Sequence, residues 1–170
     1  MKLQFKVQQH QTDAVDAVVE TFSGQPKHHG ISYRIDPGKV RPAADPELFE
    51  VNERPDAGLR NAEIKLSDAQ LLENVHAVQR SRNLPLSTKL VDSKAAPGAP
   101  NLDIEMETGT GKTYVYIKTI MELHKRYGWS KYIIVVPSVA IREGVKKSFD
   151  VTADHFQQLY GTKPRSFIYN

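Results

Sequence analysis

The stretch that decides the fold is Met106-Glu107-Thr108-Gly109-Thr110-Gly111-Lys112-Thr113. The residues just before it, 102–105, alternate apolar and acidic side chains as a short strand does. The residues after it, up to about Tyr127, have helical periodicity. Two glycines at such a junction let the backbone turn tightly and present its N–H groups to an anion at the positive end of a helix. The stretch therefore predicts a phosphate-binding loop.

The residue types of this loop predict ATP and Mg²⁺ as its cofactors. The ammonium group of Lys112 would contact the β and γ phosphates, and the hydroxyl group of Thr113 would be a ligand of Mg²⁺. Met106 stands where the strict pattern of such loops has glycine. A glycine-rich turn with a surface lysine is the alternative, but it does not explain why these residues coincide. The expected nucleotide-binding residues of the loop are Thr108, Gly109, Thr110, Gly111, Lys112 and Thr113.

Composition sets bounds on the class of protein. A chain of 170 residues is long enough for one domain with a sizeable core. The 23 Lys and Arg residues against 20 Asp and Glu residues allow a nucleic-acid partner without arguing strongly for one. Cysteine is absent, which excludes disulfides and thiolate zinc sites, and no apolar run approaches the length of about 20 residues that spans a membrane. We expect a soluble, cytoplasmic protein without a membrane partner.

The chain divides into three parts by pattern. Residues 10–22 place apolar side chains on one face of an amphipathic helix, so residues 1–23 form the first part. Residues 24–100 are rich in proline and lack a sustained period, apart from one helix at about 68–79 that a capping box at Ser67 introduces. This middle part is predicted to be an irregular insertion. Residues 101–170 form the third part.

The third part predicts an α/β fold. The strand at 102–105, the loop and the helix to Tyr127 are followed by a buried strand at 131–136, which together make a βαβ unit. Ser138 can cap the next helix, a short helix follows from about Ala153 to Gly161, and a third strand begins at Ser166. Alternating strands and helices indicate a parallel sheet flanked by helices.

Two motifs carry a resemblance to a known family. With the loop at 106–113 and Val-Val-Pro-Ser-Val-Ala-Ile-Arg-Glu-Gly at 135–144, the chain resembles the motor of superfamily 2 helicases. More narrowly, it is similar to the restriction subunit of type III restriction-modification systems. The resemblance implies the N-terminal part of a RecA-like phosphate-loop NTPase lobe, with a long insertion before the loop. It also implies an ATP-dependent DNA translocase and endonuclease, whose partners are double-stranded DNA and a modification methyltransferase subunit.

The same resemblance implies roles for three residues outside the loop. Gln11 lies where such motors place a glutamine that reads adenine, with Gln8 and Gln9 as close rivals and a solvated glutamine as the simpler alternative. Ser138 and Arg142 would contact the DNA backbone. The alternative is that Ser138 is only a helix cap and that Arg142 lies on a solvated face.

Hydrolysis of ATP needs an acidic pair that holds Mg²⁺ and positions water, and no such pair follows the loop in the right order. We therefore expect a piece of a longer polypeptide, with no catalytic residue beyond Lys112, that binds nucleotide better than it hydrolyses it. The alternatives are a general DNA or RNA helicase without a nuclease, a nucleotide-regulated binding module and, least favoured, a small-molecule kinase.

The scattered histidines do not indicate a metal site. Arg80, Arg82 and Lys89 are expected to face water, with a basic groove as the alternative.

Overall fold

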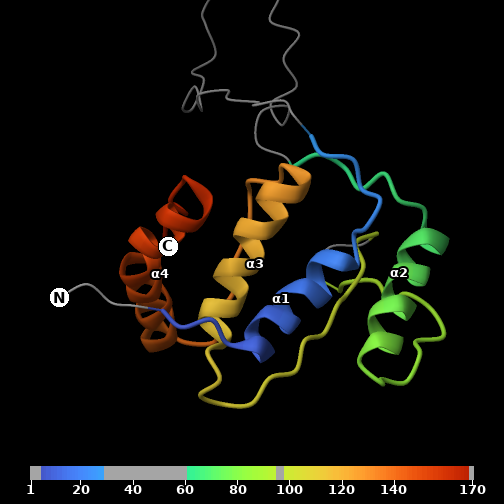
Figure 1. The fold of residues 1–170 in the computed structure, drawn as a ribbon, viewed down its shortest axis with the longest axis horizontal. Coiled ribbons are helices and arrows are strands. Elements are labelled where there is room, and N and C mark those ends of the chain that lie inside the picture. Colours follow the sequence, from blue (N-terminus) through green and yellow to red (C-terminus); the bar gives the residue numbers. More distant parts are fainter. Residues whose placement is uncertain (1–4, 29–60, 95–97, 169–170) are drawn as a thin grey trace, which may run out of the picture.

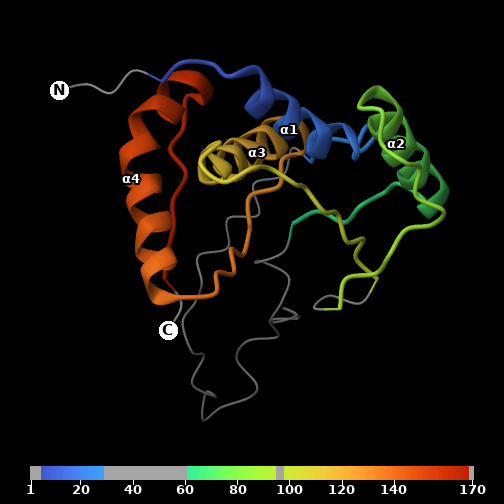
Figure 2. The same cartoon turned by 90° about the horizontal axis from the view of Figure 1, so that it is seen from below.

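The computed structural model describes residues 5–28, 61–94 and 98–168 and contains four helices in that part of the chain. These are α1 (Gln9–Glu20), α2 (Asp68–Ser81), α3 (Lys112–Tyr127) and α4 (Val139–Tyr160). Figure 1 shows them in the spatial order α4, α3, α1, α2, so that α3 packs between α4 and α1. Figure 2 shows the same arrangement from below, with α4 and α2 at opposite ends.

Helix α3 is central because its apolar residues occupy two faces. Val115 and Leu123 belong to a core that α3 shares with α1 and α2, whereas Ile117 and Met121 belong to a second core that it shares with α4. Spacings of four and eight residues keep each pair on one side of a helix. The first core consists of Val15, Val19, Phe22, Leu71, Val115, Leu123, Tyr127 and Trp129. The second consists of Ile117, Met121, Phe149 and Phe156.

The α/β fold with a parallel sheet, which the sequence predicted, is wrong for the described part of the chain. Neither 102–105 nor 131–136 forms a strand there, and the bridge between Asp92 and Pro100 is isolated. Ile133 and Val135 are 92% and 88% exposed, where a buried strand would cover them. An alternating or apolar pattern becomes a strand only when a neighbouring segment accepts and donates its backbone hydrogen bonds. These segments have no such neighbour among the described residues.

Helix α4 is one continuous helix, although the sequence suggested two. The hydroxyl group of Thr152 donates a hydrogen bond to the carbonyl oxygen of Ser148, 2.7 Å away and one turn earlier, so its polar group is satisfied within the helix. Phe149 and Phe156 are buried on the same face. The third expected strand is also absent at 166–168, and its last residue lies outside the described residues.

Helix α2 is the one helix in the described part of the predicted insertion. The capping box is present: the Ser67 hydroxyl accepts from the Gln70 backbone N–H, and the Gln70 side chain accepts from the Ser67 backbone N–H. The Asn74 side chain then donates to the carbonyl oxygens of Thr21 and Ser23, at 3.1 and 2.8 Å, just beyond the end of α1. Helix α2 therefore docks on α1. Residues 29–60 and 95–97 of the same insertion lie outside the described residues.

Within the described part of the chain, no helix combines the length and the apolar character that crossing a membrane requires.

Candidate functional site: a loop at the start of α3

The loop before α3 has the backbone geometry that its glycines predict. Gly109 and Gly111 have φ angles of 83° and 89°, in the left-handed region that glycine adopts at little cost. Thr110 closes the turn by donating its hydroxyl group to the carbonyl oxygen of Glu107 at 2.7 Å. Gly111 is the N-cap of α3, and Lys112 is the first helical residue. No side chain caps this helix end, so its first N–H groups remain available to an anion.

Helix α1 holds the loop through two side chains. The Gln11 amide nitrogen donates to the carbonyl oxygen of Thr110 at 2.9 Å, across 99 residues of sequence. Nε2 of His10 lies 3.2 Å from the same oxygen, and because a carbonyl oxygen only accepts, that nitrogen must carry the proton. A Cβ atom at Gly111 would overlap the amide nitrogen of Gln11. Glycine at this position is therefore needed both for its φ angle and for the approach of Gln11.

The structure distinguishes Gln11 from its rivals by geometry. Gln9 uses its side chain within α1, where it donates to a carboxylate oxygen of Asp13 at 2.8 Å. Gln8 precedes the helix, is exposed and makes no capping hydrogen bond with its side chain. Gln11 is half-buried and contacts the loop. Of the three glutamines, Gln11 is the one placed beside the loop.

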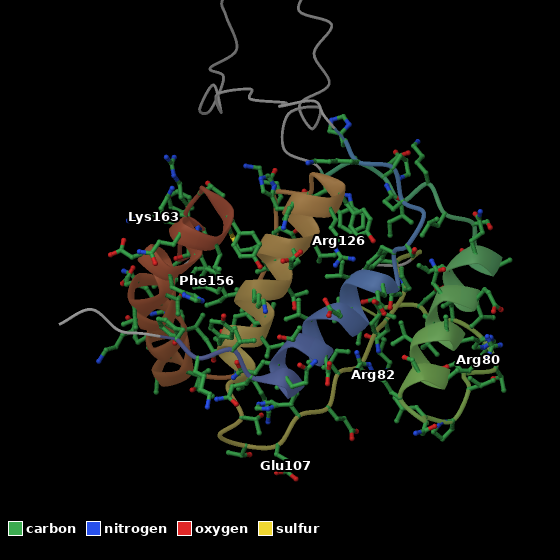
Figure 3. All side chains as sticks on the ribbon, in the orientation of Figure 1. Arg80, Arg82, Glu107, Arg126, Phe156 and Lys163 are labelled. Atoms are coloured by element: carbon green, nitrogen blue, oxygen red, sulfur yellow. The ribbon has the colours of Figure 1, made fainter. Side chains whose placement is uncertain are left out.

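The space beside the loop is open and has one cationic side chain, that of Lys112, in its lining. An open hollow of about 560 Å³ is lined by Ile104, Glu105, Met106, Glu107 and Lys112. A Cβ atom placed at Gly109 would meet no atom within 4 Å, so the backbone there faces open space. Lys112 is exposed and supplies a positive charge. Two exposed carboxylates, those of Glu105 and Glu107, line the same hollow, and the carboxylate of Glu107 points away from the helices in Figure 3.

Thr108 and Thr113 flank the same turn. Thr108 is exposed, whereas Thr113 is half-buried in the first turn of α3. An uncapped helix end, a lysine and a threonine hydroxyl next to it are the donor set that Mg²⁺-bound ATP would need. The residues present thus fit the cofactors that the sequence predicts.

Ser138 and Arg142 lie at the start of α4 and both have partners within the chain. The Ser138 hydroxyl oxygen accepts a hydrogen bond from the Ile141 backbone N–H at 3.3 Å and so caps α4. The Arg142 guanidinium lies 3.3 Å from the carboxylate of Glu143. The structure therefore gives Ser138 the capping role that the sequence left as an alternative.

Sequence reasoning missed a polar link between the start of α3 and α4. The Tyr114 hydroxyl group lies 2.9 Å from Nε2 of His155, and the ring of Phe5 packs against both. Burial raises the pKa of Tyr114, while burial and the nearby charge of Lys118 lower the pKa of His155. Because the partners lie 41 residues apart, no local pattern could have revealed the pair.

Comparison with known proteins agrees with the two motifs. A family model described as the res subunit of type III restriction enzymes matches residues 4–166. The EcoP15I Res subunit of Escherichia coli is 34% identical over 161 residues, and the EcoPI Res subunit of Escherichia phage P1 is 29% identical over 163 residues. Each alignment covers 94% of this chain. The StyLTI Res subunit of Salmonella typhimurium is 46% identical over 78 residues, or 45% of the chain.

The chain spans 14% of the length of the first two relatives and 7% of the third. All three are named as Res subunits of type III restriction-modification enzymes. The family model covers nearly the whole chain, including α1, the loop at 106–113 and the second motif at 135–144. The chain belongs to the family of type III restriction enzyme Res subunits.

Proposed function

We propose that the loop at 106–113 binds Mg²⁺-bound ATP and that the chain is the nucleotide-binding part of a type III restriction enzyme motor. The observation that supports this most is the start of α3. Gly111 leaves the helix end without a side-chain cap, and Lys112 follows at once beside an open hollow. Uncapped N–H groups and the helix dipole favour a bound phosphate.

In this proposal the residues divide the work of holding ATP. The backbone N–H groups around Gly109 and Gly111 cradle the phosphates, Lys112 neutralises charge on the outer phosphates, and the Thr113 hydroxyl binds Mg²⁺. Gln11 has two N–H donors and one carbonyl acceptor, and the Thr110 carbonyl uses one donor. The remaining donor and the acceptor can pair with the edge of adenine. Gln11 would then hold the loop and read the base at the same time.

For the whole protein we propose an ATP-dependent enzyme that moves along double-stranded DNA and cleaves it together with a modification subunit. The support is the membership of the Res family and the likeness of 135–144 to a helicase motif. Ser138 and Arg142 would contact the DNA backbone, the former through its hydroxyl proton because its oxygen already caps α4. A nucleotide-regulated binding module remains the second candidate, supported by the docking of α2 on α1.

The binding proposal is tested by titrating Mg²⁺ and ATP into the chain in a calorimeter, for wild type, Lys112→Ala and Lys125→Ala. A hydrogen bond to a charged group contributes about 1.5–3 kcal/mol, so Lys112→Ala should weaken binding roughly 10-fold to 100-fold. Lys125 lies near the other end of α3, above the ring of Tyr160, and its removal should leave the affinity unchanged.

Two outcomes contradict the proposal. Wild-type chain that binds no nucleotide would reject the site, and Lys112→Ala with wild-type affinity would reject the assigned role of the lysine. Wild-type chain that binds no nucleotide but captures the modification subunit would favour the binding-module alternative. Circular dichroism of each variant checks that the four helices remain folded.

A further inference from the structure

Arg82, directly after α2, does not face water as the sequence suggested. Its guanidinium donates from Nη2 to the carbonyl oxygen of Asp13 in α1 at 2.6 Å, and the side chain is half-buried. Figure 3 shows Arg82 beside α1, whereas Arg80 lies on the side of α2 that faces away from α1. Arg80 instead pairs with Glu73 at the surface, at 2.9 Å. The two arginines therefore have the same side chain, but Arg82 binds the backbone of α1 whereas Arg80 pairs with a residue of its own helix.

The contact of Arg82 is close to the residue that holds the loop. Asp13 follows Gln11 by two positions, so the two lie on nearly opposite sides of α1, about 200° apart. Gln11 faces the loop and bonds to Thr110, and Arg82 bonds to the helix backbone at Asp13. The first half of α1 is thus held from α2 on one side and bonded to the loop on the other.

The second half of α1 has anchors of its own. The Tyr127 hydroxyl donates to the carbonyl oxygen of Val19 at 2.8 Å, and Asn74 donates to the carbonyl oxygens of Thr21 and Ser23. Loss of Arg82 would leave these contacts intact. Its effect should therefore fall on the half of α1 that carries Gln11.

We propose that Arg82 is a positioning residue for the nucleotide site. It fixes the first half of α1 so that Gln11 stays on the Thr110 carbonyl and presents its remaining amide groups to the adenine. This inference rests on the proposed ATP site and gives residues 61–94 of the insertion a function there. Arg82 itself touches neither the loop nor the nucleotide.

The first experiment compares the binding of Mg²⁺-bound ATP and of inorganic tripolyphosphate to the 170-residue chain. Arg82→Ala should weaken ATP binding about threefold to tenfold, the loss expected for about one hydrogen bond, and weaken tripolyphosphate binding by a smaller factor, because only ATP also loses the contact of its adenine with Gln11. Arg82→Lys should recover part of the loss, because it keeps the charge but not the planar guanidinium. Arg80→Ala should match wild type for both ligands. A purely structural role for Arg82 would weaken both ligands equally, and that result would overturn the inference.

The second experiment needs no nucleotide, so it separates this inference from the proposed function. Hydrogen exchange of the α1 amides should be faster in Arg82→Ala than in wild type over the half that contains Gln11 and Asp13. The half next to Val19 and all of α3 should keep their protection, and Arg80→Ala should show no change. If α1 exchanges alike in Arg82→Ala and wild type, the inference fails even where ATP binds. If exchange changes as expected but wild type binds no ATP, then Arg82 does fix the first half of α1, and it is the proposed function that fails.

Discussion

Helices α3 and α4 begin in opposite ways. Helix α4 begins after Ser138, whose side-chain oxygen accepts from the Ile141 N–H, so the chain satisfies its own helix end. Helix α3 begins after Gly111, which has no side chain to offer. Neither helix has an acidic residue in its first turn. The difference teaches that the cap residue decides whether a helix end is closed by its own chain or left for an anion.

The loop before α3 is nevertheless fixed by hydrogen bonds. These bonds are made to the carbonyl oxygen of Thr110 and not to the N–H groups of the helix end. Gln11 and His10 both reach the Thr110 carbonyl, which leaves the N–H groups of the next residues uncommitted. A site of this kind is ordered and still open. That combination reduces the ordering cost when a ligand binds.

The largest effect on this comparison is expected from Gly111→Ala. The φ angle of 89° is unfavourable for alanine, and the added Cβ would overlap the Gln11 amide. Left-handed strain of this kind costs about 1–3 kcal/mol, so the free energy of unfolding should fall by about that amount, and ATP binding should be lost because Gln11 must also move away from the loop. Urea denaturation followed by circular dichroism measures the first effect.

Gly144→Ala is the matched control, because Gly144 lies inside α4 and a Cβ there meets no atom within 4 Å. Alanine in a helix interior is favoured by about 0.5–1 kcal/mol, so this variant should be slightly more stable than wild type. If both glycine variants changed stability alike, the special geometry assigned to Gly111 would be wrong.

A smaller effect on stability is expected at the start of α4, which Ser138 caps. Ser138→Ala removes the N-cap of α4 and should lower the free energy of unfolding by about 1 kcal/mol, with no change in ATP affinity. Ser138→Asp keeps a capping oxygen but adds a negative charge, so it should stay folded and weaken the binding of a DNA duplex. Thermal unfolding and fluorescence anisotropy with labelled DNA separate the two roles. Unchanged DNA affinity in Ser138→Asp would reject the proposed backbone contact.

The smallest effect is expected at the contact between Tyr114 of α3 and His155 of α4. The pKa of His155 lies below its ordinary value of 6.5 because of burial and the charge of Lys118. The unfolded chain therefore takes up the proton first as the pH falls, and stability contributed by neutral His155 is complete above about pH 6.5 and declines below it. His155→Gln should flatten the dependence of the unfolding temperature on pH between about 7 and 5. Equal slopes in wild type and variant would contradict this assignment.

Helices α1, α2 and α3 could be predicted from sequence because their hydrogen bonds are local, whereas α4 was expected as two helices and is one. The apolar face of residues 10–22, the capping box at Ser67 and the glycine after Tyr127 all act within one or two turns. The expected strands depended on partners elsewhere in the chain. In 131–136 the apolar run that suggested a buried strand is instead exposed at Ile133 and Val135, because the described residues supply no adjacent strand.

The loop of the candidate site could be predicted from sequence, but the contacts of His10 and Arg82 around it could not. Glycine, lysine and threonine at 109–113 form a local pattern, and a family resemblance drew attention to Gln11. The contacts of His10 and Arg82 join residues 100 and 69 positions apart, and both residues look like ordinary surface side chains in sequence. Only the packing of α1 between α3 and α2 brings them into place.

The most direct test of the central claim is to record the backbone amide resonances of the two helix ends while Mg²⁺-bound ATP is added. We predict that the amides of Gly111, Lys112 and Thr113 shift progressively and saturate, whereas the amide of Ile141, already bonded to Ser138, does not. Absence of shifts at the start of α3, or equal shifts at the start of α4, would contradict the account.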